Sequence, residues 1–239
     1  SPQGKLRHAD RVSARVEIVL SRALIILLGA VIGSSLGFAA KSLIKRIDSE
    51  SRKFSSRIVV VTFVIGAVVS DLILLRFSEI ELRLCFAILF SGLLVQSLID
   101  FFTHRLVRQI SHGMAVSGAL LLGIYAVRVS NIDALVAAGV CAAFGVAVSI
   151  FSNKISSGSL GAGDVRLMAV LGWHLGFLSY STAIWALFSA CLLAGLFGVV
   201  MIVLRRGSWQ QRIAFGPFLS LGSLAAIFAN EVSSYAFTA

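Results

Sequence analysis

The chain has 239 residues, of which 58% are hydrophobic and 13% are charged, and its formal net charge is +10. A soluble domain usually carries about 25% charged residues, so this composition excludes a water-soluble globule and indicates an integral membrane protein. The basic residues stand between apolar runs, which is typical of loops beside anionic membrane lipid and argues against a nucleic-acid partner.

Apolar runs long enough to cross a bilayer, which takes about 20 residues, recur along the whole chain. They occupy residues 23–40, 58–75, 82–99, 113–127, 133–151, 165–180, 182–204 and 213–230. We therefore expect an all-α polytopic membrane protein with about eight transmembrane helices. The sixth run is short, contains His174 and adjoins the seventh almost without a loop, so whether it crosses the bilayer completely stays open.

The distribution of lysine and arginine predicts the orientation of the chain. The loops 41–57, 101–112, 152–166 and 205–212 hold 13 basic residues, whereas the opposite side holds 3 when the N-terminal tail is left out. We expect the first set of loops on the cytoplasmic side of the plasma (inner) membrane. The basic tail, residues 1–22, disagrees with this assignment: either it is an interfacial amphipathic helix or the first span is misassigned.

Three of the eleven acidic residues are attached to apolar spans: Asp71, Asp100 and Asp164. A carboxylate at membrane depth costs roughly 2.5–3.5 kcal/mol and is a candidate functional group. Two spans separate Asp100 from Asp164, so both reach the cytoplasmic face, whereas Asp71 lies near the opposite face. Neighbouring carboxylates share one proton. The ionised member can then take a proton from water as it attacks. The protonated member can stabilise the carbonyl oxygen and later protonate the leaving amine.

This pair suits the hydrolysis of an amide, and because the two groups titrate together, which of them is the base stays open. Gly161 and Gly163 predict a backbone that bends and lets another chain approach closely. Arg166, beside Asp164, is a candidate for orienting the substrate backbone or lowering the pKa of its neighbour. Two other interpretations remain at this point: an aspartate that caps the next helix, and a non-enzymatic transporter that uses both carboxylates as a proton relay.

The sequence around both aspartates resembles the type IV prepilin peptidase family, membrane aspartyl proteases of the Gly-x-Gly-Asp type. The run GAGDVRLMAVLG, which begins at Gly161, is similar to the family block Gly-x-Gly-Asp-Val-Lys-Leu. The run DFFTHRLVR, which begins at Asp100, is similar to Asp-x-x-x-x-x-Ile-Pro-Asn. A third run, AFGPFL, is similar to Pro-Phe-Gly-Pro-Phe-Leu and contains Phe215, Gly216 and Pro217.

The resemblance implies that Asp100 and Asp164 are the catalytic pair. It also implies cytoplasmic cleavage of the leader of a prepilin or pseudopilin, next to that substrate's hydrophobic helix. Phe215, Gly216 and Pro217 are then supporting residues. Val107 stands where the family has proline, which puts the geometry near Asp100 in doubt. The expected organisation is a basic tail (1–22), N-terminal transmembrane helices (23–81) with the loop 41–57, a catalytic core (82–230) and a C-terminal tail (231–239).

Many family members carry a cytoplasmic domain with Cys-x-x-Cys motifs that is linked to N-methylation. This chain has no such motif and only the loop 41–57 at that place. We expect a short, Tad-type form that cleaves without methylating and uses no zinc, S-adenosylmethionine or other cofactor. His104 and His112 lack a third metal ligand, so no metal site is expected.

One alternative is an intramembrane protease similar to presenilin or signal peptide peptidase. Those relatives pair Tyr-Asp with a later Pro-Ala-Leu motif, whereas Ile99 precedes Asp100 here. Glycines spaced four residues apart predict close helix packing, either within one chain or in a dimer. They are Gly29, Gly33 and Gly37, and further along Gly172 and Gly176. The oligomeric state, the particular prepilin and its cleavage-site preference stay open.

Overall fold

The computed structural model describes residues 2–47, 56–155, 161–204 and 214–236. These residues form eight α-helices and no strand, which confirms the all-α fold. The helices are α1 (Pro2–Ile47), α2 (Ser56–Arg76), α3 (Ile80–Thr103), α4 (Arg108–Arg128), α5 (Ile132–Ile155), α6 (Ala162–Leu178), α7 (Tyr180–Val203) and α8 (Gly216–Ala236). The expected loop 205–212 lies outside the described residues, as do parts of the loops 41–57 and 152–166.

Each expected span coincides with one helix, but the helices differ in length. Among the described residues, six are long and apolar enough to cross a membrane, namely α1 to α5 and α7, so this is a multi-pass membrane protein. The sixth helix has 17 residues, and α8 contributes a shorter apolar stretch, Gly216–Ala229. Ser179 alone separates α6 from α7: its extended backbone ends α6, and its Oγ accepts a hydrogen bond from the Thr182 N–H at 3.0 Å.

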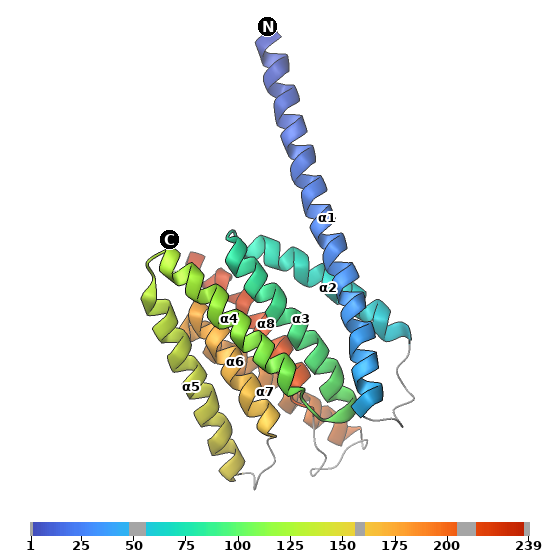
Figure 1. The fold of residues 1–239 in the computed structure, drawn as a ribbon, viewed down its shortest axis with the longest axis vertical. Coiled ribbons are helices and arrows are strands. Elements are labelled where there is room, and N and C mark those ends of the chain that lie inside the picture. The colour runs from blue at the N-terminus through green and yellow to red at the C-terminus, as the bar shows by residue number, and fades with distance from the viewer. Residues whose placement is uncertain (1, 48–55, 156–160, 205–213, 237–239) are drawn as a thin grey trace.

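The first helix is longer at both ends than the expected span at 23–40. Its N-terminal part projects from the bundle in Figure 1, so the tail at 1–22 is helical from Pro2 onward. At the other end, residues 41–47 are helical where the sequence analysis expects a loop. The reason is that Ile44 is buried, with Ala40, against Val95 and Ile99 of α3.

The spaced glycines serve packing between helices of this chain. The Cβ that Gly33 lacks would collide with the Thr62 carbonyl oxygen of α2. A Cβ at Gly172 would come within 2.5 Å of the Cys141 carbonyl oxygen of α5. Of the two alternatives above, contact within one chain therefore accounts for this glycine spacing. The α1–α2 pair is also joined at the end far from residues 41–47, where Arg22 binds Asp71 through two hydrogen bonds of 2.6 and 2.9 Å.

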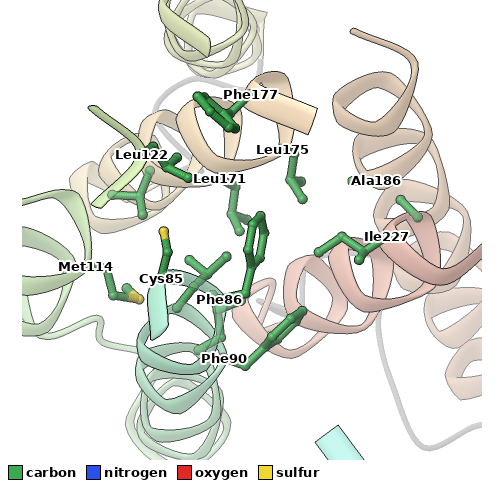
Figure 2. Packing of buried hydrophobic residues seen from close by; sticks show 14 of the residues in the cluster. Cys85, Phe86, Phe90, Met114, Leu122, Leu171, Leu175, Phe177, Ala186 and Ile227 are labelled. Carbon is green, nitrogen blue, oxygen red and sulfur yellow. The ribbon is translucent and has the colours of Figure 1, made fainter. Parts of the chain in front are cut away.

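The third helix lies in the middle of the bundle and is the most buried of the six long helices. Phe86 and Phe90 point from α3 towards Leu171 of α6 and Ile227 of α8, as Figure 2 shows. This packing holds α3, α6 and α8 together around one apolar core. It also brings the last turn of α3 to the same end of the bundle as the first turns of α6 and α8, opposite the projecting part of α1 (Figure 1).

Candidate active site

Asp100 lies in the last turn of α3 and is 6% exposed. Its Oδ2 accepts a hydrogen bond of 2.8 Å from the backbone N–H of Gly216, the first residue of α8. The N–H groups of a helix's first turn have no partner inside the helix, and the partial positive charge there favours a carboxylate. The start of α8 is thus a ready binding site for the ionised side chain of Asp100.

Gly216 also leaves the space that this carboxylate fills. A Cβ built at Gly216 would stand 2.9 Å from Oδ2 and 3.3 Å from the Cβ of Asp100. The sequence analysis expects Gly216 as a supporting residue from the resemblance alone. In the structure, Gly216 contributes to the position of Asp100 in two ways: its N–H donates a hydrogen bond to the carboxylate, and its lack of a side chain leaves room for that carboxylate.

Asp164 lies in the first turn of α6, where its Oδ2 accepts a hydrogen bond of 3.3 Å from the Gly161 N–H. This bond forms part of a capping box at the start of α6, which is the contact that the helix-capping interpretation describes. Asp164 precedes the apolar part of α6 and lies outside the six candidate spans. Its pKa is raised to about 6, first by burial and then by the negative charge of Asp100, against the lowering effect of the Gly161 hydrogen bond. The two carboxylates are thus close enough for one charge to act on the other.

The two glycines of the motif play different parts. A Cβ at Gly163 would come within 2.8 Å of the Leu106 Cβ, so the residue lets the turn between α3 and α4 reach α6. Gly161 is exposed, and a Cβ there would meet only Asp164 Oδ2, at an ordinary 3.5 Å. The backbone of Gly161, with φ −71° and ψ 151°, is open to any residue. The backbone at Gly161 therefore does not itself require glycine, and the close approach at Gly163 comes from this chain's own Leu106.

Arg166 is half-buried one turn into α6 and makes no hydrogen bond or ion pair with the residues that the structure describes. The causes that shift the pKa of Asp164 are burial, Asp100 and the Gly161 hydrogen bond. Both roles considered for Arg166, lowering this pKa and orienting the substrate backbone, stay predictions.

The other two residues of the third motif, AFGPFL, lie away from the carboxylate: one packs against the core and the other lines a surface groove. Phe215 is half-buried against the main apolar cluster. Pro217, in the first turn of α8 where proline fits well, lines an apolar groove of about 380 Å³ between α2, α3 and α8. The groove begins at Phe101 and Phe102, directly after Asp100, and continues as far as Val69 of α2.

Other candidate residues are placed away from this site. Asp71 is paired with Arg22 at the end of the α1–α2 pair far from residues 41–47. His174 is completely buried, and its Nδ1 is bonded to the Val170 carbonyl at 2.7 Å, which makes it a packed histidine. In the described part of the chain, no three histidine, cysteine or acidic side chains gather as metal ligands.

Sequence reasoning missed two residues near the site, Gln96 and Leu106. Gln96 is fully buried one turn before Asp100, and Leu106 packs on Gly163. An amide inside an apolar span was the available signal for Gln96, because a buried polar group must find hydrogen-bond partners. The available signal for Leu106 was its place in the run DFFTHRLVR, where it stands at the isoleucine of the similar family block.

Comparison with known proteins identifies the same region. Residues 87–199 match a sequence model described as the type IV leader peptidase family. The chain is also similar to a prepilin leader peptidase/N-methyltransferase of Bacillus subtilis, with 29% identity over 108 residues. That alignment covers 45% of this chain and 42% of the relative, so it spans less than half of either protein. No solved structure matches the chain significantly. The part of the chain that carries Asp100 and Asp164 is therefore similar to the type IV leader peptidase family.

Proposed function

We propose that this protein is a membrane aspartyl endopeptidase that removes the N-terminal leader of prepilins or pseudopilins at the cytoplasmic face of the plasma membrane. The observation that carries the proposal is the raised pKa of Asp164 beside the buried Asp100. Two carboxylates that hold one proton between them are the general acid and base that peptide hydrolysis needs. The similarity of residues 87–199 to that family supports the choice of substrate class.

The surroundings of the two aspartates favour one distribution of the shared proton. Asp100 accepts the short hydrogen bond from Gly216 at the positive end of α8, which suits the ionised member. Asp164 has the longer bond from Gly161 and the raised pKa, which suits the protonated member. In the proposed reaction Asp100 takes a proton as water attacks the scissile carbonyl carbon. Asp164 donates its proton to the carbonyl oxygen, which gives a tetrahedral intermediate with two hydroxyl groups. The C–N bond breaks when the leaving nitrogen receives the proton held by Asp100 and one of these hydroxyl groups returns a proton to Asp164.

The apolar groove between α2, α3 and α8 gives the substrate's hydrophobic segment a place beside the site. Its walls are lined by apolar side chains such as Leu94 and Leu221, and its polar Ser97 and Ser220 are hydrogen-bonded to each other at 2.7 Å. An apolar helix in the groove leaves no polar wall group without a partner. The groove ends at Phe101, which is next to Asp100 in the chain. A substrate helix that lies in the groove therefore presents the peptide bond at its end to the two carboxylates.

Arg166 completes the proposed site as a cation for the substrate backbone. Its side chain stands two residues after Asp164 and has no ionic partner among the described residues. Full cleavage by both Arg166→Lys and Arg166→Ala would remove this role while leaving the aspartate pair untouched.

The test is cleavage of a prepilin from the same genome, co-expressed with wild type, Asp100→Asn or Asp164→Asn. Mobility and N-terminal sequencing of the pilin report the product. We expect each variant to insert in the membrane and to lose at least about 100-fold in cleavage. Asp133→Asn, at an exposed carboxylate that begins α5, is the matched control and should cleave normally.

Other outcomes separate the alternatives. Cleavage by both aspartate variants would show that the catalytic assignment is wrong. Failure of wild type to cleave any prepilin of the genome would contradict the peptidase proposal. It would favour the alternative in which the same carboxylates transport protons.

A further inference from the structure

Gln96 is a completely buried amide in α3, one turn before Asp100. Its Oε1 accepts a hydrogen bond of 2.8 Å from the Val107 N–H. Its Nε2 donates to the Val107 carbonyl oxygen at 3.2 Å and to Ser111 Oγ at 2.7 Å. A buried amide must replace the hydrogen bonds it made to water, and Gln96 does so with Val107 of the turn between α3 and α4 and with Ser111 in the first turn of α4.

That turn has weak local support of its own. It begins at His104, whose left-handed backbone (φ 50°) ends α3. It ends at Val107, which precedes α4 with an extended backbone and a side chain that cannot cap the helix. The Val107 N–H would otherwise be a polar group beside an apolar core, so its bond to Gln96 fastens the turn to α3. The Val107 carbonyl accepts from the Ser111 N–H at 3.4 Å as well as from Gln96.

The fastened turn reaches the second aspartate. Leu106, the neighbour of Val107, is the side chain that occupies the space beside Gly163. Gly163 in turn precedes Asp164. A continuous set of contacts therefore leads from Gln96 through the turn to the first residues of α6.

We infer that Gln96 is a positioning residue for the aspartate pair: through Val107 it holds Leu106 against Gly163 and so sets where Asp164 stands relative to Asp100. It acts through the turn and does not touch the reacting atoms. The inference rests on the proposed function for its effect on catalysis, while the geometry it asserts is measurable without any substrate.

The geometric test uses disulfide cross-linking in the full chain in native membranes. Leu106→Cys and Gly163→Cys are combined, with Cys191→Ala removing an exposed thiol. We expect a disulfide to form: the two Cβ positions stand 2.8 Å apart, and a shift of about 1 Å brings them to the roughly 3.5–4.5 Å of a disulfide. Adding Gln96→Leu, which deletes all three hydrogen bonds, should lower its yield. Adding Gln109→Leu, the same change at an exposed glutamine of α4, should leave the yield as it was.

The catalytic test uses the single variants without added cysteines. Gln96→Leu should lower kcat by about 10- to 100-fold, since a displacement of about 1 Å at a catalytic group has effects of this size. KM should change less than kcat, because the apolar groove is untouched. Gln96→Glu keeps an oxygen that accepts from the Val107 N–H and should restore part of both kcat and cross-linking. Ser111→Ala removes one of the three hydrogen bonds of Gln96 and should lower kcat only slightly.

An unchanged cross-linking yield in the Gln96→Leu background overturns the inference, whether or not cleavage is seen. If wild type cleaves no prepilin while Gln96→Leu still lowers the yield, the positioning stands and only the proposed function fails. Should Gln96→Leu not accumulate in membranes, Val107→Pro is the second variant. Proline fits the φ of −81° at that position and lacks the N–H that Gln96 accepts. An unchanged yield there also overturns the inference.

Discussion

The backbone N–H of Gly216 donates a 2.8 Å hydrogen bond to Oδ2 of Asp100 across 116 positions of the chain. The contact joins the end of α3 to the start of α8 and leaves room for no side chain at position 216. It gives the buried carboxylate of α3 a hydrogen-bond donor from another helix.

The Gly216→Ala variant should lose most of its activity. The added Cβ would stand 2.9 Å from Oδ2, so the carboxylate must move and its hydrogen bond to the N–H must weaken. We expect a loss in cleavage of about tenfold or more, in line with the removal of one well-placed charge-assisted hydrogen bond. Gly195→Ala, at an exposed glycine of α7 with nothing within 4 Å, is the control. Equal cleavage by both variants would contradict the role assigned to Gly216.

Cleavage should decline as the pH rises through the pKa of Asp164, about 6. The proposed reaction needs one proton on the pair, and above this pH Asp164 loses it. The measurement is kcat/KM of the purified enzyme across the range from acid to mildly alkaline pH. A rate that keeps rising well above the pKa would show that the protonated form of Asp164 is not required.

The same shift has a consequence for stability, which provides an independent check. The folded pKa of Asp164 lies above its ordinary value of 3.8, so the unfolded chain releases this proton first. The carboxyl therefore costs stability progressively between about pH 4 and pH 6 and fully above that range. Asp164→Asn should raise the free energy of unfolding at neutral pH by about 1–2 kcal/mol, a figure reduced for partial exposure. Thermal unfolding at acidic and neutral pH would detect it.

The two glycines before Asp164 should respond differently to the same substitution. Gly163→Ala forces a Cβ to 2.8 Å from the Leu106 Cβ, which is part of a backbone-anchored side chain and cannot simply rotate away. Gly161→Ala places its Cβ at van der Waals distance from Asp164. We expect Gly163→Ala to lose about tenfold or more in cleavage and Gly161→Ala to stay close to wild type, measured side by side in membranes. The reverse order would show that Gly161 serves substrate approach.

Filling the apolar groove should weaken substrate binding while sparing the catalytic groups. Leu94→Trp places a larger side chain between α2, α3 and α8, whereas Leu120→Trp makes the same change at an exposed position of α4. We expect Leu94→Trp to raise KM several-fold with a smaller change in kcat, the pattern of lost binding that ground state and transition state share. Equal kinetics for the two variants would place the substrate's apolar segment elsewhere.

The helices of this protein could be predicted closely from the sequence, because an apolar segment inside a bilayer must satisfy its backbone hydrogen bonds within itself. All eight expected spans are helices. The errors lie at their ends: α1 continues to Ile47 because Ile44 finds a buried place against Ile99 of α3. Such a contact depends on a neighbouring helix and not on local composition.

The sequence by itself also determined that Asp100 and Asp164 are exceptional, since carboxylates attached to apolar spans are costly. It predicted in addition that both lie at one face of the membrane. Only the tertiary structure decided what surrounds them. The Gly216 N–H on Asp100, Leu106 on Gly163 and the Gln96 amide on Val107 each join separate parts of the chain. Hydrogen bonds and close packing act over only a few ångströms. Which residues become partners therefore depends on how the helices pack, and local sequence does not show it.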